Sequence, residues 1–498
     1  MNTLRRTLVA LAAALMLGLT AAQPVVVMQS ADAATLDPTM NRETSTFNAL
    51  LHIFDALLSK NPDGSYGPAL ATAWTVTDET VWDFTLRDDV IFHDGSRLTA
   101  DDVVFTIERI LDEATESPIA GGFSFIESAE ATGEHALRVT TNAPTPLAEH
   151  YFSELLIISR DAFELLGADD FARVPIGTGP YRVVEWQRDV ALKLEAFEGH
   201  WRGPAAISDL EIRPVPEAST RVAALQTGEA DLIVQVPPTL APVLEAASGV
   251  TVTGVPGARS IYIGFNVTGG NAALQDANVR RALNLAVDVD AIIEGVLAGR
   301  AEPTTGFLAS MDFGYIDTFS PYPYDPEAAR ALLAEAGYAE GELSLDLHSP
   351  NGRYVGDANV AQAVAEQLEQ VGIDVNLEIR EYGAYVGDLF SGNAPDLYLI
   401  GWGNAPLDAD FINYPLLRTG ELLAYYSSDE LDAALDAGRS TVDRDERLAA
   451  YTTAAAHIDA NAPALFLYKQ QDLYGLSDRL DWTPRTDERV WLYDATIE

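Results

Sequence analysis

Helical and strand patterns alternate through the middle and the C-terminal part of this chain of 498 residues, and this alternation restricts the fold class strongly. In PEASTRVAALQTGEADLIV (216–234), a helical pattern stops near Gly228 and a buried strand follows. The same order returns at 359–379, where Gly372 ends the helix, and at 445–470. Such alternation is typical of α/β layers with open sheets. In these sheets, ligands bind in a crevice at the carboxyl ends of the strands.

Capping residues set the ends of some of these helices. DPEAARALLAEAGY (325–338) has Asp325 as N-cap, Pro326 at the first helical position and Gly337 where a C-terminal glycine belongs. The stretch 276–299 predicts a pair of helices, and DLYLIGWG (396–403) predicts a buried strand that runs into a tryptophan.

The stretch VIFHDGSRLTADDVVFTIERI (90–110) suits either a metal site or scaffold, because His93 stands beside Asp94. Thr99 is a good N-cap, and Asp101 and Asp102 fall in the first helical turn, where the helix dipole favours carboxylates. The seven histidines of the chain show no ligand spacing. We therefore interpret the stretch as scaffold and predict no metal site there.

The N-terminus predicts a cleavable secretory signal over residues 1–22. It has Arg5 and Arg6, an apolar run from Leu8 to Leu19, and then small residues. The run is shorter than a spanning helix needs, although an uncleaved N-terminal anchor stays an alternative. We expect an exported, soluble protein in the periplasm or another extracytoplasmic place. The chain has no cysteine, which excludes a lipoprotein anchor.

The charge of the chain is strongly negative, with 75 acidic against 31 basic residues and a formal net charge of −44. Phosphate backbones would be repelled, so we expect no nucleic-acid partner. The only lysines are Lys60, Lys193 and Lys469. Such an acidic, lysine-poor composition fits a salty habitat or a genome bias, and the sequence leaves both open. A hydrophobic content of 48% indicates a globular protein.

Motifs for catalysis are missing from the sequence. It has no GxSxG, no HExxH and no cysteine for thiol catalysis. The GTG of residues 177–179 is followed by Pro180 and opens no helix, so it is not a nucleotide fingerprint. We predict neither an enzyme nor a cofactor, and a secreted hydrolase is the least favoured alternative.

Five segments resemble one family when they are taken in order. They are 68–110 with its FHDG and TADDV motifs, GTGPYRVVEW (177–186), VRRALNLAVDVDAII (279–293), YDPEAARALLAEAGY (324–338) and VAQAVAEQLEQVGIDVNL (360–377). Together they resemble the extracellular solute-binding proteins of family 5, the oligopeptide, dipeptide and nickel binders that serve ABC importers.

The resemblance implies a type II periplasmic-binding-protein fold of the α/β class, with two lobes around a ligand cleft and an extra N-terminal α/β domain. Lobe I is expected at 24–58, 177–266 and 478–498, the extra domain II at 59–176 and lobe III at 267–477. The implied function is capture of a small solute, peptide-like or another polar compound, by hinge closure. The expected partners are that ligand and a membrane ABC permease with its ATPase, and the protein is expected to be a monomer.

The resemblance also implies ligand contacts. Trp402, beside Gly401, matches the family's ligand-binding tryptophan loop, with a buried core tryptophan as the alternative. Peptide binders carry an aspartate three residues later, which pairs with the α-amino group of the ligand. This chain has Ala405 there, which weakens the peptide assignment because a buried ammonium without a carboxylate is unfavourable.

Other candidates come from both sides of the expected cleft. Arg353 in SPNGRYVGD (349–357) matches an arginine with which dipeptide binders hold a carboxylate, and a solvated loop arginine is the alternative. Tyr354, Asn404, Tyr262, Thr44 and Ser45 are further candidate contacts. Uptake of nickel or a metal chelate remains an alternative function, with His348 as its one suggestive ligand.

Overall fold

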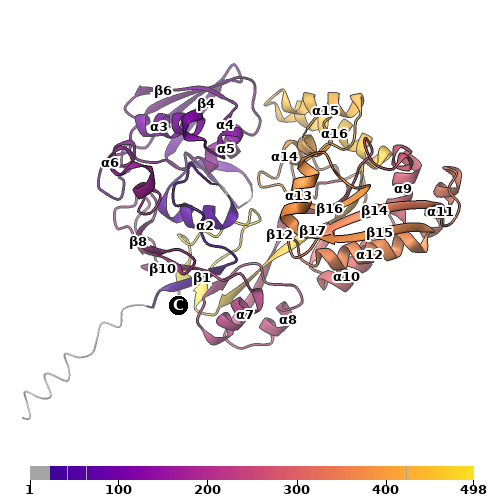
Figure 1. The fold of residues 1–498 in the computed structure, drawn as a ribbon. Coiled ribbons are helices and arrows are strands. Elements are labelled where there is room, and N and C mark those ends of the chain that lie inside the picture. The colour runs from indigo at the N-terminus through magenta and orange to yellow at the C-terminus, as the bar shows by residue number, and fades with distance from the viewer. Residues whose placement is uncertain (1–22, 42, 63, 422) are drawn as a thin grey trace, which may run out of the picture.

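The computed structural model describes residues 23–41, 43–62, 64–421 and 423–498. Two large bodies lie side by side and are joined by long strands (Figure 1). Among the described residues, none of the helices has the length and the apolar character to cross a bilayer. The expected signal at 1–22 lies outside the described residues.

One mixed sheet of eleven strands runs through both bodies. Its order is β15 (Ile373–Arg380), β14 (Leu343–Pro350), β16 (Leu397–Gly403), β12 (Val250–Phe265), β17 (Ala464–Ser477), β11 (Leu232–Ile233), β1 (Val25–Gln29), β10 (Asp209–Pro214), β9 (Ala191–Ala196) and β8 (Tyr181–Gln187), with β13 (Ala301–Pro303) beside β17. The α/β fold class predicted from the sequence is confirmed.

The long strands β12 and β17 carry the chain from one body to the other (Figure 1). They pair antiparallel from Val250 to Gly264, with a register shift between Pro256 and Ser260. Gly257 lies in that shift, and a Cβ atom there would come 2.6 Å from the carbonyl oxygen of Gln470. Close backbone approach therefore requires glycine at this point of the crossing.

The first body has two parts. We call the part around β1 and β8–β11 lobe I. Its core holds Val25, Leu50, Leu210 and Leu492. The helix α2 (Thr44–Ile53) packs here, and a second apolar cluster joins α7 (Ala218–Thr227) and α8 (Ala241–Glu245) to the sheet. The C-terminal segment thus completes the core that the N-terminal strand begins, and the short pair β18 (Leu480–Asp481) and β19 (Thr496–Ile497) lies at its end.

Domain II is the other part of the first body. It is built around a separate sheet of four strands, and its core includes Trp82 and Phe152. The strand order is β4 (Ala71–Thr77), β5 (Val81–Leu86), β7 (Ala136–Thr141) and β6 (Ile126–Gly133). Its helices are α3 (Ala100–Leu111), α4 (Ala120–Phe123) and α5 (Ala148–Glu154), with a 3-10 turn at Glu113–Thr115. The next helix, α6 (Arg160–Phe171), buries Phe171 in the core of lobe I. The hairpin of β2 (Leu58–Lys60) and β3 (Tyr66–Pro68) connects domain II with lobe I.

Lobe III is the second body. It is built around β14, β15 and β16 and around the parts of β12 and β17 that pair there. Its core includes Leu345, Val364 and Leu399, all fully buried. Helices cover both faces: α9 (Ala277–Leu285), α10 (Val289–Leu297), α11 (Pro326–Glu335), α12 (Asp357–Gln370), α13 (Tyr382–Phe390), α14 (Ala409–Leu417), α15 (Asp429–Arg439) and α16 (Arg444–Asn461), with a 3-10 turn at Ala272–Gln275.

The caps predicted from the sequence are confirmed. The Asp325 side chain accepts a hydrogen bond from the Ala328 amide at the start of α11. Thr99 and Asp102 form a reciprocal capping box at α3. Because these contacts join residues close in sequence, local patterns were enough to find them.

His93 makes the structural contacts that the scaffold interpretation expects, and the absence of a metal site there stays a prediction. Its Nε2 lies 3.0 Å from the Gly179 carbonyl oxygen, and its Nδ1 accepts from the Gly177 amide. Burial lowers the pKa of His93 to about 4, so the ring is neutral and acts as a bridge between two segments. Asp94 caps the turn through the amide of Ser96. The lobe boundaries given above remain predictions.

Candidate functional site

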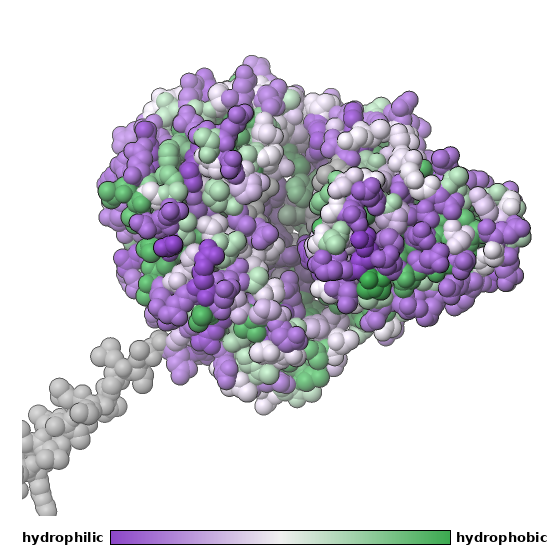
Figure 2. Space-filling model, viewed as in Figure 1, coloured by the Kyte–Doolittle hydropathy of each residue, from purple (hydrophilic) through white to green (hydrophobic). Residues whose placement is uncertain are grey.

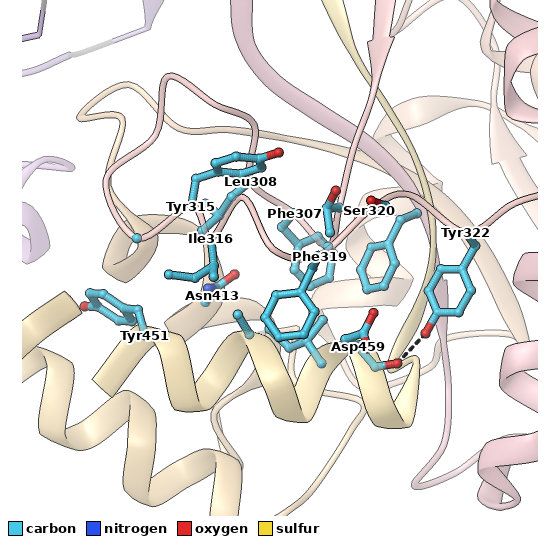
Figure 3. A pocket seen from close by; sticks show the side chains of 16 residues that line it. Phe307, Leu308, Tyr315, Ile316, Phe319, Ser320, Tyr322, Asn413, Tyr451 and Asp459 are labelled. Carbon is cyan, nitrogen blue, oxygen red and sulfur yellow. Dashed lines mark hydrogen bonds between the residues drawn. The ribbon is translucent and has the colours of Figure 1, made fainter. Parts of the chain in front are cut away.

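Two cavities of different size are candidates for a ligand site. The smaller one, of about 30 Å³, lies inside lobe III between the 305–322 loop and α14 and α16 (Figure 3). Aromatic rings line it, Tyr322 donates to the Asp459 carbonyl oxygen at 2.6 Å, and the amide oxygen of Asn413 is buried without a partner among the described residues. A volume near that of one water molecule is too small for a solute.

The larger cavity, of about 400 Å³, lies between lobe I and domain II and meets lobe III at Ala405. A volume of this size is in the range of small-molecule sites. Figure 2 shows a groove between the two bodies. The lining includes Phe47 and Leu51 of α2, the β2–β3 hairpin, His150 and Glu154 of α5, Arg202, Arg485, Asp487, Arg489, Trp491 and Asp494.

Lys60 links the two sides of this cavity. It ends β2, and its ammonium group donates a hydrogen bond to the carbonyl oxygen of Ala405 in lobe III. The Asp487 carboxylate lies 3.7 Å from the same nitrogen, and the Lys60 side chain is 10% exposed. Burial lowers the pKa of Lys60, although the charge of Asp487 opposes that change.

Ion pairs organise the lobe I wall of the cavity. Arg485 binds both carboxylate oxygens of Asp487, at 3.0 and 2.7 Å, and also donates to the Lys60 carbonyl oxygen. Arg489 donates to Glu154 at 2.7 Å. Burial opposes the charge of Asp487, but the Arg485 hydrogen bonds and the charge of Lys60 outweigh it and lower the pKa to about 2. The Asp487 carboxylate is therefore ionised at neutral pH.

The 401–408 loop of lobe III, here called the lobe III wall, borders the cavity through Ala405. Asn404 is fully buried; its amide nitrogen donates to Asp312, and its amide oxygen accepts from the Asp408 amide. Asp312 in turn accepts from the Lys469 ammonium at 2.6 Å. Trp402 is half-buried and donates to the Phe411 carbonyl oxygen. The loop thus has one conformation that its own buried hydrogen bonds define.

Four of the predicted contact residues, Gly401, Trp402, Arg353 and Tyr354, lie in or next to this loop, and like Asn404 they are not among the residues that line the large cavity. The Tyr354 hydroxyl donates to the carbonyl oxygen of Gly401, next to Trp402, at 3.2 Å. The exposed Arg353 guanidinium lies 5.1 Å from the centre of the Tyr354 ring. Among the described residues, Arg353 has no carboxylate partner. Ligand contact by these residues, and by Asn404, stays a prediction.

The other three candidates lie elsewhere. Tyr262 of β12 is buried in the lobe III core, its hydroxyl has no partner among the described residues, and burial raises its pKa. Thr44 and Ser45 form the first turn of α2, whose later residues Phe47 and Leu51 line the large cavity. Their part in ligand binding also stays a prediction.

A charged cluster lies where the two lobes meet. Arg259 of β12 donates to the Gly401 carbonyl oxygen at 3.4 Å and lies 3.6 Å from Glu488. Close by, one oxygen of Asp472 is buried without a partner among the described residues. Burial and the charge of Glu488 raise the pKa of Asp472 to about 7, against the effect of Arg259.

Metal ligands do not gather in the described part of the chain: no group of three or more histidine, aspartate or glutamate residues there is arranged to hold an ion. His348, the suggestive residue for nickel uptake, lies 3.3 Å from Glu378 on the neighbouring strand β15.

Reasoning from the sequence missed Lys60, Arg485, Asp487 and Arg489. The rarity of lysine is the signal that could have pointed to Lys60. Two of the three lysines, Lys60 and Lys469, are almost buried, at 10% and 3% side-chain exposure.

A family model described as bacterial extracellular solute-binding proteins, family 5 Middle, matches residues 65–422, well over half of the chain. This chain belongs to that family. The resemblance seen in the sequence is thus confirmed, and the family 5 protein is the substrate-binding component of an ABC importer.

Curated relatives match the family 5 protein along most of its length. The glutathione-binding protein GsiB of Pectobacterium atrosepticum is 29% identical over 474 residues, which cover 92% of this chain and 91% of that protein. GsiB of Escherichia coli K12 is 29% identical over 457 residues, 89% of this chain and 88% of that one.

Solved structures show the same fold. DppA of Helicobacter pylori, in complex with the peptide STSA, has a TM-score of 0.79 and 26% identity, covering 96% of this chain and 98% of that one. CtaP of Listeria monocytogenes has a TM-score of 0.87 at 24% identity, over 95% of this chain and 99% of that one. NikZ of Campylobacter jejuni, in complex with Ni(L-His), has a TM-score of 0.80 at 24% identity, over 95% and 99%.

Proposed function

We propose that this protein captures a small peptide-like solute in the cavity that Lys60 and Ala405 help to line and delivers it, unchanged, to an ABC permease. The observation that carries the proposal is the cavity of about 400 Å³ that lobe I and domain II form and that lobe III meets at Ala405. The GsiB relatives are named for glutathione and DppA was solved with a peptide, which supports a short peptide or peptide-like ligand.

Capture by closure of the two bodies follows from the strand crossing. Lobe III is joined to the rest of the chain through β12 and β17, which shift register at Gly257. Across the groove, Lys60 contacts Ala405 and the His150 ring lies 5.7 Å from the Phe411 ring. We infer that rotation about the shift opens these contacts and that a ligand inside the groove favours the closed state.

The wider proposal covers the domains, the partners and the place of action. Lobe I comprises 24–58, 177–266 and 478–498, domain II 59–176, and lobe III 267–477. The protein is a monomer, exported through a cleaved signal at 1–22 to the periplasm or an equivalent extracytoplasmic place. It works without a cofactor and without catalysis, and its membrane partner is a permease with its ATPase.

Isothermal titration with glutathione, dipeptides and tripeptides tests the ligand class, with a nickel–histidine chelate as the comparison. We expect saturable binding of at least one peptide-like compound and a smaller radius of gyration in solution scattering when it is bound. Binding of the chelate alone, or of none of these compounds, would contradict the proposal. The matched variant Trp402→Ala should bind more weakly while keeping its melting temperature.

A further inference from the structure

We propose that Lys60 determines which solutes this site accepts: its ammonium group favours compounds that present a carboxylate at Ala405 and excludes compounds that present an ammonium there. This inference rests on the proposed function, because it assumes that the solute occupies the cavity lined by Lys60 and Ala405. It adds a chemical class, an anionic peptide-like compound with a blocked or absent amino group at that end.

The backbone of Lys60 is fixed in place from two sides. In the β2–β3 hairpin it pairs with Tyr66, and its carbonyl oxygen accepts from Arg485 at 2.9 Å. The side chain extends from there to the carbonyl oxygen of Ala405 in lobe III. The ammonium is therefore a positioned part of the cavity wall.

The carbonyl oxygen of Ala405 already accepts a hydrogen bond from the ammonium group of Lys60. An ammonium carries three hydrogen-bond donors, and Lys60 uses one on Ala405 while Asp487 lies 3.7 Å away. A ligand carboxylate can accept a hydrogen bond from one of the remaining N–H groups of Lys60. A ligand ammonium would meet a positive charge in a site that is largely shielded from water, where repulsion is strong.

Acidic groups of the lining are mostly committed to other partners. Asp55 accepts from Thr178 and Trp201, and Asp487 and Glu154 bind Arg485 and Arg489 respectively; the exposed Asp494 lies at the rim. A ligand ammonium thus finds no uncommitted carboxylate inside the described lining. The cost of burying it unpaired disfavours such a ligand.

The balance of charge in the lining also differs from that of the whole chain. Four basic residues, Lys60, Arg202, Arg485 and Arg489, face four acidic ones, Asp55, Glu154, Asp487 and Asp494. The whole chain has 31 basic and 75 acidic residues. Arg202 is exposed, stacks on Trp201 at 4.5 Å and has no carboxylate partner among the described residues. The lining is thus balanced in charge, so an anion is repelled less there than by a chain with the overall net negative charge.

Matched probes test the inference. Each is titrated as a free amine and as its N-acetyl derivative: trialanine with N-acetyltrialanine, and glutathione with N-acetylglutathione. We expect the wild-type protein to bind the acetylated member of at least one pair about tenfold more tightly or better. In Lys60→Met that preference should fall to about one, and Lys60→Arg should retain most of it.

The control variant is Lys193→Met, which removes an exposed lysine whose partner is Glu185 at 2.7 Å. It should keep the wild-type preference, and melting curves should show that all variants fold. If the wild type binds the free amines as tightly as the acetylated probes, or if Lys60→Met keeps the full preference, the inference is overturned while the proposed function stands. If neither these four probes nor any dipeptide binds, the proposed function fails and the inference fails with it.

Discussion

The two walls of the site use charge in different ways. The lobe III wall is supported by a buried network in which the Asp312 and Lys469 side chains are 0% and 3% exposed and have only protein partners in the described structure. On the lobe I and domain II wall, the charged side chains border a cavity, and Arg485, Arg489 and Lys60 are 17%, 12% and 10% exposed.

The difference separates shape from recognition. Charged side chains without access to water need protein partners for all of their hydrogen bonds. Their main effect is therefore to hold one loop conformation. Charges at a cavity keep donors that water or a ligand can use. We therefore expect substitutions in the first wall to change stability most and substitutions in the second to change affinity most.

The largest effect should come from Asp312→Ala. It leaves the Lys469 ammonium buried without its carboxylate and removes the acceptor of the Asn404 amide. We expect a loss of about 3–5 kcal/mol in the free energy of unfolding, measured by urea denaturation. Arg138→Met, which breaks the exposed pair with Asp83, is the control and should leave the midpoint unchanged. Equal midpoints for both variants would remove the distinction between the walls.

The next effect concerns Asp472, at the junction of the walls beside Arg259, Glu488 and Gln470. Its pKa of about 7 in the folded protein lies above the ordinary value of 3.8. Between these values the folded state keeps a proton that the unfolded state releases, so this group makes the protein less stable as the pH rises from about 4 to 7.

We expect Asp472 to account for about 2 kcal/mol of stability lost between pH 5 and 7. Asp472→Asn should remove that dependence, which thermal melting across this pH range measures. A variant whose pH profile follows the wild type would show that Asp472 is ionised in the folded protein. Glu488→Gln should lower the pKa of Asp472, because it removes the like charge.

Gly257→Ala tests the crossing between the walls. The new methyl group would lie 2.6 Å from the Gln470 carbonyl oxygen and 2.9 Å from Asp472, so the two strands must separate. We expect a loss of about 1–2 kcal/mol in stability and altered closure in solution scattering. Gly121→Ala is the matched control, since nothing lies within 4 Å of its new atom. A fully tolerated Gly257→Ala would argue against a tight crossing.

The smallest effect on stability should come from Arg485→Met on the cavity wall. It removes the pair with Asp487 and the hydrogen bond to the Lys60 carbonyl oxygen. Water in the cavity can replace part of both, so we expect a loss of roughly 1 kcal/mol together with a clear loss of ligand affinity in titration. A collapse in stability as large as that of Asp312→Ala would show that this wall, too, is structural.

Local structure could be predicted from the sequence, and contacts between distant segments could not. The caps of α3 and α11 and the end of α12 at Gly372 depend on neighbouring residues, so capping patterns found them. The spacing of Leu50, Phe54 and Leu57 predicts a helix over 46–58, but α2 starts at Thr44 and ends at Ile53, because Phe54 turns to extended backbone. Short amphipathic runs rarely mark such ends.

The site itself illustrates the limit. The tryptophan loop and the Arg353 loop were predicted from the resemblance of the sequence to family 5. The structure brings Tyr354 and Gly401 of these loops together. Lys60 and Ala405 are 345 residues apart in sequence, and Lys60 and Arg485 are 425 apart. No periodicity or spacing encodes contacts of that range, since they depend on how three bodies pack.

A crystal structure of the protein with a bound peptide-like ligand, either retained from its host or added as N-acetylglutathione, tests the central claim most directly. We expect density for the ligand in the cavity of about 400 Å³, with a carboxylate at Lys60 and lobe III closed over it at Ala405. Ligand density outside the groove between the bodies, or a bound ligand with an ammonium group at Ala405, would contradict this account.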